Sequence, residues 1–166
     1  FEVRPASTER RVFVVDRPGA VQSERRVGHV GAARSVPDYY PLSMANMVLG
    51  GMFTSRLNLN LRERNGFTYG VRSRFTFRSR PGPLQIATAA GTDVTVAAVR
   101  EIVHELETMA EGGPSEAELS AARDYAAGVF GLQLETAGQV ANRISQLLVF
   151  GLPDDHFDRY RDAVRS

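Results

Sequence analysis

Apolar residues follow two different patterns along the chain, and the change comes near residue 92. Before it, they alternate with polar residues or form short β-branched runs, which is typical of strands. Four strands are predicted in this part: residues 11–16, 20–32, 67–78 and 84–92. The turn sequence Pro81-Gly82-Pro83 joins the last two, so we expect them to form an antiparallel hairpin.

Helical spacing of apolar residues marks two segments between the second and third strands and nearly everything after residue 92. The predicted helices cover residues 35–49, 55–65, 93–111, 115–135 and 138–150, with a last helix from residue 154. Ser115 and Glu118 have the spacing of a capping box at the start of one of them. The helix over 138–150 is expected to bury its apolar stripe of Val140, Ile144, Leu147 and Leu148.

Strands come first and helices mostly follow, which favours an α+β fold over a doubly wound parallel sheet. We expect a two-layer α/β sandwich with a mainly antiparallel sheet and helices packed on one face. The length of 166 residues suits one domain. Because the sequence begins with Phe1 rather than Met, we expect residues 1–166 to be one domain of a longer chain.

Charge and composition narrow the function classes. The chain has 20 basic and 19 acidic residues, a balance that argues against a nucleic-acid-binding protein. No apolar run approaches the roughly 20 residues of a membrane span. Every basic residue is arginine, which suggests a GC-rich bacterial genome and leaves cytoplasm and periplasm or cell envelope equally open. The absence of cysteine excludes disulfides and thiolate zinc ligands.

The histidines do not have the spacing of a metal site. His29, His104 and His156 are far apart in the sequence, whereas paired zinc ligands on a helix lie one turn apart. We therefore predict no zinc site, and no other cofactor, in this chain. A dispersed Ser/His/Asp triad stays open as an alternative, although no GxSxG elbow supports it.

The pair Arg62 and Tyr69 is the most informative candidate for chemistry. Arg62 lies near the end of a predicted helix and Tyr69 at the start of a predicted strand, seven positions later. The chain reversal between them can bring a guanidinium and a phenol to the same sheet edge, where both can donate hydrogen bonds to a peptide carbonyl. In the alternative interpretation, Arg62 caps its helix and Tyr69 belongs to the core.

Around this pair the sequence GGMFTSRLNLNLRERNGFTY has the pattern GGxFxSRLxxxLRExxGxxY. It resembles the C-terminal domain of the pitrilysin, insulinase and mitochondrial processing peptidase family of zinc metallopeptidases. The resemblance extends over nearly all the chain from about residue 11, including GGPSEAELSAARDYAAGVFGLQLET and GLPDDHFDRY. It implies the family's α+β half-clamshell domain.

The resemblance also implies roles for particular residues. Arg62 and Tyr69 match the arginine and tyrosine that bind the substrate backbone or polarise the scissile carbonyl, opposite a zinc site in a different domain. Phe53, Ser55 and Arg56 are then candidate substrate-binding residues; the alternative is turn and helix-cap chemistry. Arg72, Arg74 and Arg78 form either a basic wall or a solvated face. The family's HxxEH zinc motif is absent from this sequence.

These observations predict a substrate-binding domain of a zinc metalloendopeptidase that cleaves unfolded peptides. The domain alone is expected to be inactive, with zinc supplied by an N-terminal-type domain or a partner subunit. At full length we expect a homodimer or heterodimer, with a peptide as substrate. The alternative from another class is a non-catalytic scaffold or peptide-binding subunit with the same fold.

Overall fold

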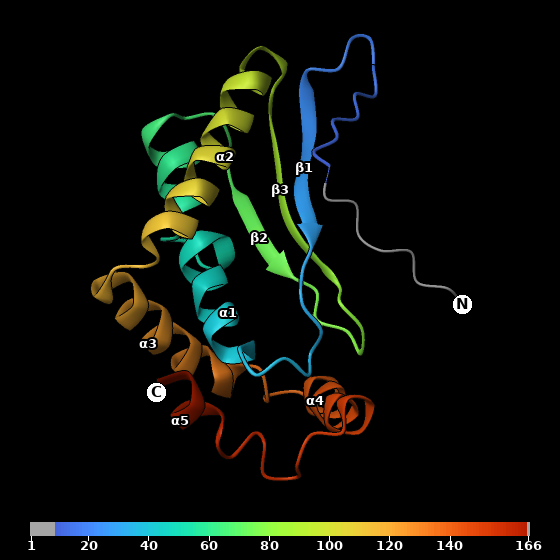
Figure 1. The fold of residues 1–166 in the computed structure, drawn as a ribbon, viewed down its shortest axis with the longest axis vertical. Coiled ribbons are helices and arrows are strands. Elements are labelled where there is room, and N and C mark those ends of the chain that lie inside the picture. Colours follow the sequence, from blue (N-terminus) through green and yellow to red (C-terminus); the bar gives the residue numbers. More distant parts are fainter. Residues whose placement is uncertain (1–8, 166) are drawn as a thin grey trace.

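The computed structural model describes residues 9–165, which form a three-stranded antiparallel sheet with helices against it. The strands are β1 (Gln22–Val30), β2 (Val71–Phe75) and β3 (Pro83–Gly91), and β3 lies between the other two (Figure 1). Ile86 on β3 is opposite Val27 on β1 and Ser73 on β2. The predicted hairpin of the second and third of these strands is confirmed.

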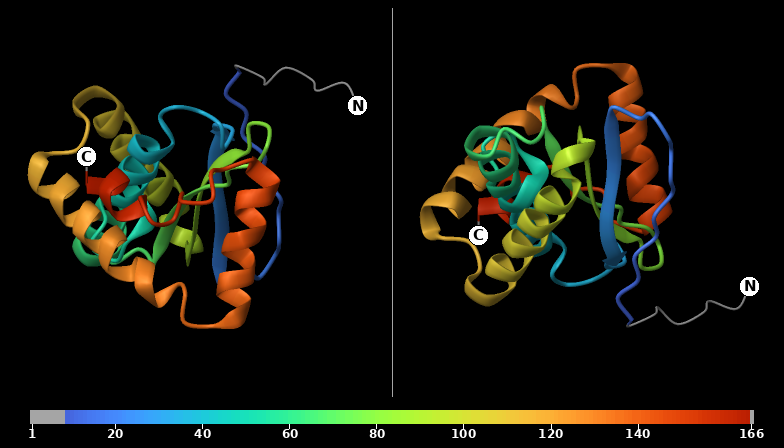
Figure 2. Two further views of the ribbon diagram at one scale, coloured as in Figure 1. Left: turned by 90° about the horizontal axis from the view of Figure 1, so that it is seen from below. Right: turned by 90° about the horizontal axis from the view of Figure 1, so that it is seen from above.

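Helices cover one face of the sheet, as Figures 1 and 2 show for α1 and α2. The α+β, two-layer prediction is therefore confirmed. The helical elements are α1 (Tyr39–Asn46), η1 (Met47–Gly51), η2 (Asn58–Arg64), η3 (Thr92–Val94), α2 (Thr95–Gly112), α3 (Glu116–Leu132), α4 (Ala137–Phe150) and α5 (Tyr160–Arg165). No helix within residues 9–165 has the length and apolar character that crossing a membrane requires.

The main core lies between the sheet and these helices. It contains buried residues from η1, from η2 and the residue before it, from both strands of the hairpin and from α2: Leu49, Leu57, Leu61, Val71, Ile86, Ala98 and Ile102. Gly50 lets η1 approach β2, because a Cβ there would lie 2.7 Å from the backbone nitrogen of Ser73. Leu57 and Leu61, one turn apart in the sequence, anchor η2 in this core.

Residues 11–16 are not a strand, contrary to the prediction. Their side chains from Val12 to Val15 are 85–90% exposed, and within the described residues β1 pairs only with β3. A β-branched run supplies strand propensity, but a strand also needs a partner for its backbone hydrogen bonds.

Helix α4 is where predicted, but its apolar stripe is not buried. A capping box of Thr136 and Gln139 begins the helix, and Gly151 ends it with a left-handed φ of 61°. Val140, Ile144 and Leu148 are nevertheless exposed, and Figure 1 shows α4 apart from α1 and α2. Apolar periodicity indicates that a helix is amphipathic. It does not identify the surface against which the apolar stripe packs.

The last helix begins later than predicted. The sequence places its start at residue 154, whereas α5 begins at Tyr160. Residues 154–159 form turns instead, in which the His156 N–H donates to the Pro153 carbonyl at 3.0 Å.

Candidate functional site

A buried asparagine joins the helix of Arg62 to the strand that follows Tyr69. The Asn58 amide accepts a hydrogen bond from the Val71 N–H at 3.1 Å and donates to the Met52 carbonyl at 3.2 Å and the Ser55 hydroxyl at 3.1 Å. These bonds connect η2, the turn before it and β2. Because Asn58 is buried, it fixes the two elements relative to each other.

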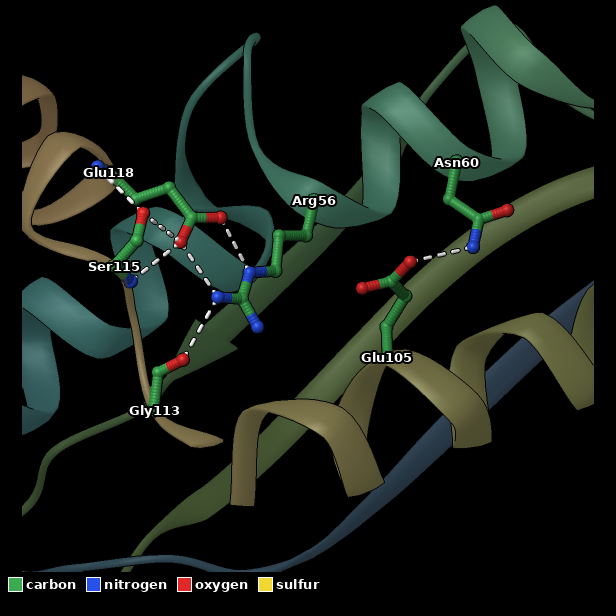
Figure 3. Close-up of polar contacts among 6 residues, drawn as sticks. All are labelled: Arg56, Asn60, Glu105, Gly113, Ser115 and Glu118. Atoms are coloured by element: carbon green, nitrogen blue, oxygen red, sulfur yellow. Dashed lines mark hydrogen bonds and ion pairs between the residues drawn. The ribbon is translucent and has the colours of Figure 1, made fainter. Parts of the chain in front are cut away.

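Two positions further along, η2 is tied to α2. Asn60 is buried and donates from its amide nitrogen to the carboxylates of Glu101 (2.9 Å) and Glu105 (2.7 Å). Figure 3 shows the contact with Glu105. Asn65 then donates to the Asn60 carbonyl and side-chain oxygen, which closes the end of the helix. Arg62 therefore stands on a helix that is held at both ends.

Two threonines hold the loop that carries Tyr69. The Thr68 hydroxyl donates to the Ala89 carbonyl on β3 at 2.7 Å and accepts from the Gly70 N–H at 3.1 Å. The Thr88 hydroxyl lies 2.9 Å from both the Thr68 hydroxyl and the Gly70 carbonyl, and its one proton can be donated to either. The backbone around Tyr69 is thus fixed by its neighbours, while the Tyr69 side chain itself is 95% exposed.

That exposure settles one alternative. Strand β2 begins at Val71, so the alternation that places Tyr69 on the core face does not extend back to it. The interpretation of Tyr69 as a core residue is wrong. The loop between Gly66 and Gly70 turns instead through the Thr68 hydrogen bonds, and sequence alternation does not report such a turn.

Arg62 and Tyr69 line the same open pocket, which has a volume of about 450 Å³. Its other walls include Glu63 and the end of β3 from Ala89 to Gly91. Arg62 and Tyr69, seven positions apart in the sequence, therefore border one space at the surface of the domain. A ligand in this pocket would meet two kinds of hydrogen-bond donor at a strand end.

Within the described residues, the guanidinium of Arg62 donates no hydrogen bond. Its Nη1 lies 3.4 Å from the Glu63 carboxylate as an ion pair, but it is buried without a hydrogen-bond acceptor. Its Cζ lies 4.3 Å from the ring centre of Phe53. The guanidinium carries three further N–H donors, on Nε and Nη2, and the side chain is 32% exposed, so these donors rather than the buried Nη1 can serve a ligand.

Arg56 has the opposite environment. Its Nε and Nη2 donate to the two carboxylate oxygens of Glu118 at 2.6 and 2.7 Å, and Nη2 also donates to the Gly113 carbonyl at 2.9 Å. Figure 3 shows this ion pair beside Ser115, whose hydroxyl completes the predicted capping box of α3. The Arg56 hydrogen bonds are the main reason why the pKa of Glu118 is lowered to about 2.

The five predicted site residues thus separate into two groups. Arg62 and Tyr69 line the pocket; Phe53, Ser55 and Arg56 do not. Ser55 is buried and accepts from Asn58, and Arg56 is bound to Glu118. Phe53 is exposed but faces Arg62. Turn and helix-cap chemistry accounts for the positions of Ser55 and Arg56, so neither enters the proposed substrate site.

Asn58, Asn60 and Thr68 position the site, and the sequence reasoning missed all three. A signal for the asparagines is present in LNLNLRERN, where two poor helix formers lie within a short leucine-rich helix. Residues of that type inside a helix suggest side-chain hydrogen bonds. Thr68 gives no comparable signal, because its partners on β3 are about 20 positions away in the sequence.

The three histidines lie in separate places. His29 contacts the Val30 carbonyl, His104 is exposed on α2, and His156 pairs with Arg34 at 3.0 Å. Since arginine can only donate, the Nε2 of His156 accepts this bond. Across residues 9–165 no three histidine or carboxylate side chains are grouped as metal ligands would be.

By geometry this is an α+β domain with a donor-rich open pocket and no metal-ligand cluster among its described residues. The family described as the peptidase M16 inactive domain matches residues 2–125. The chain therefore belongs to the peptidase M16 family, and the predicted resemblance is confirmed.

Solved structures agree on the fold. The chain is similar to the peptidase M16 inactive domain from Pseudomonas fluorescens, with 26% identity, a TM-score of 0.77 and coverage of 88% of this chain and 34% of that chain. A protease from Helicobacter pylori gives 20% identity, a TM-score of 0.80 and coverage of 92% and 36%. Complex III2 from Candida albicans gives 15% identity, a TM-score of 0.74 and coverage of 89% and 37%.

The chain spans about a third of the length of these three structures. A comparison with the curated proteins gives no match.

Proposed function

We propose that this chain is the substrate-holding domain of a zinc metalloendopeptidase that cleaves unfolded peptides. The zinc would be held by another domain or a partner subunit, where its chemistry is to activate the attacking water. Membership in the peptidase M16 family and the likeness to its inactive domain support this proposal. The matched region makes up 34% and 36% of the chains of two of the similar structures, which leaves room there for such a counterpart.

In this proposal Arg62 and Tyr69 bind the backbone of an extended peptide. The observation that carries it is the pocket shared by an exposed phenol and a guanidinium without hydrogen bonds among the described residues. A guanidinium stays charged at any working pH, and both groups donate to carbonyl oxygens. Donors of this kind stabilise the negative charge that develops on a carbonyl oxygen during attack.

The test is peptide cleavage by the full protein, in the presence of its zinc-bearing domain or subunit, with Arg62→Ala and Tyr69→Phe. We expect kcat/KM to fall on the order of 10²-fold for each, because each variant removes a donor to the developing oxyanion. Arg64→Ala is the matched control, since Arg64 is an exposed arginine on the same helix that does not line the pocket. Cleavage at the unaltered rate in both site variants would refute the assignment.

The alternative proposal is a non-catalytic scaffold or peptide-binding subunit. Its support is the fold shared with a chain of a respiratory complex, at 15% identity. Peptide cleavage by the full protein with its zinc-bearing counterpart distinguishes the two proposals. A scaffold shows no cleavage with its counterpart and zinc present, and Arg62→Ala then changes at most peptide affinity.

A further inference from the structure

Phe53 is a large exposed aromatic residue in the turn between η1 and η2. The residues around it are fixed: Met52 and Ser55 are buried, the Ser55 N–H donates to the Met52 carbonyl, and Asn58 donates to the same carbonyl. The ring nevertheless stands 67% exposed. Its position is therefore set by the backbone of the turn rather than by burial of its own surface.

The Arg62 guanidinium lies over the face of this ring, with its Cζ 4.3 Å from the ring centre. Helical side chains lean toward the N-terminus of their helix, so an arginine in the last turn of η2 can reach back toward the turn that precedes the helix. The negative face of the ring attracts the cation. The ring also blocks one side of the guanidinium plane.

Glu63 forms an ion pair with Nη1 of the same guanidinium at 3.4 Å. A flexible arginine that is held by a ring face and a carboxylate has fewer rotamers to lose when a ligand binds. Its hydrogen-bond donors nevertheless remain uncommitted among the described residues. This combination restricts orientation without using up the donors, unlike the hydrogen bonds that hold Arg56.

We infer that Phe53 is a positioning residue that holds the Arg62 guanidinium in its binding orientation, rather than a residue that binds substrate. This inference rests on the proposed function of Arg62. It replaces the expectation that Phe53 contacts the peptide, because Phe53 does not line the pocket shared by Arg62 and Tyr69.

A double-mutant cycle in the full protein with its zinc-bearing counterpart tests the inference. We expect Phe53→Leu to lower kcat/KM about three- to fivefold, the size of one exposed cation–π contact. Phe53→Tyr keeps the ring face and should retain the wild-type value. In the Arg62→Ala background, Phe53→Leu should have no further effect, since the group that it positions is gone. Tyr125→Leu, at an exposed aromatic residue on α3, is the control.

The outcomes separate the two proposals. An equal loss from Phe53→Leu in both backgrounds means that Phe53 contacts the peptide itself, and this overturns the inference while Arg62 keeps its role. If Arg62→Ala alone leaves cleavage unchanged, the proposed function fails first.

A second readout does not depend on activity. In NMR spectra of the 166-residue chain, the ring current of Phe53 should shift the Arg62 side-chain signals upfield. Phe53→Leu should remove this shift and Phe53→Tyr should preserve it. Identical Arg62 shifts in wild type and Phe53→Leu would contradict the stacked geometry, and unchanged thermal unfolding would show that both variants are folded.

Discussion

Arg56 and Arg62 lie on one short helical segment, six positions apart, and have opposite surroundings. The side chain of Arg56 is 17% exposed and gives its hydrogen bonds to Glu118 and Gly113. The side chain of Arg62 is 32% exposed and donates none among the described residues. The burial differs modestly, so the available donors, rather than exposure, distinguish a structural arginine from a candidate binding arginine.

The difference has a simple cause. Arg56 lies at the start of the helical segment, beside the N-terminus of α3, where the capping residue Glu118 presents a carboxylate. Arg62 lies in the last turn of η2, facing the loop before β2, where the nearby carboxylate of Glu63 pairs with it from the side without a hydrogen bond. The two arginines therefore have different roles, because the neighbouring element supplies a hydrogen-bond acceptor to Arg56 and, among the described residues, none to Arg62.

The largest expected effect that separates these roles is on stability. Arg56→Ala leaves the Glu118 carboxylate half-buried without its cation, and we expect it to lower the free energy of unfolding by about 3 kcal/mol. Arg62→Ala should lower it by no more than about 1 kcal/mol, because it removes one cation–π contact and an ion pair without a hydrogen bond. Urea unfolding of both variants checks this. Equal destabilisation by the two would remove the distinction between them.

Much of the fold follows from sequence because its signals are local. The capping box at Ser115, the alternation of β3 and the turn at Pro81-Gly82-Pro83 each specify structure within a few residues, and each is where expected. The exposed residues 11–16 and the exposed stripe of α4 differ from prediction for the opposite reason. A local pattern indicates that a segment can be buried. Whether it is buried depends on another surface of the molecule that covers it.

The candidate site is predictable in its residue types but not in its division of roles. The spacing of Arg62 and Tyr69 is visible in the sequence. A helix followed by a chain reversal then brings both residues to one pocket. The partner of Arg56 is 62 positions away in the sequence, and the Thr68 contact with β3 is equally non-local. No local pattern identifies which of two neighbouring arginines has its donors satisfied by a distant element.

Asn58 is expected to affect both stability and activity, because its hydrogen bonds support the core and the site together. Asn58→Ala leaves the buried Val71 N–H without its acceptor, and we expect a loss of about 2 kcal/mol in the free energy of unfolding. It should also lower kcat/KM of the full protein, since η2 and β2 lose their link. Urea unfolding and peptide cleavage, measured on the same variant, check both. If stability falls and kcat/KM does not, the positions of Arg62 and Tyr69 do not depend on this hydrogen bond.

The pH dependence of stability tests the structural role of the Arg56–Glu118 ion pair. Hydrogen bonds from Arg56 lower the pKa of Glu118 from 4.5 to about 2. The stabilisation is therefore complete above pH 4.5 and is lost as the pH falls from there toward 2. Wild type should exceed Glu118→Gln in unfolding midpoint at pH 7, and the gap should narrow between pH 5 and 3. A gap that stays constant over this range would contradict the ionised pair.

Arg34 provides the smallest test, because it is more buried than Arg56 and its partners are an aromatic ring and an imidazole: it stacks on Tyr39 and donates to His156. Burial, and then the charges of Arg34 and Arg143, lower the pKa of His156 below 6.5. The neutral ring is also the form that accepts the bond from Arg34. The contribution is thus present above pH 6.5 and is lost as the pH falls through the lowered pKa. His156→Gln offers a permanent acceptor, so its midpoint of urea unfolding should change less than that of wild type between pH 8 and 5. Parallel curves would mean that the imidazole carries no part of the stability, and that an arginine can be buried here on aromatic stacking alone.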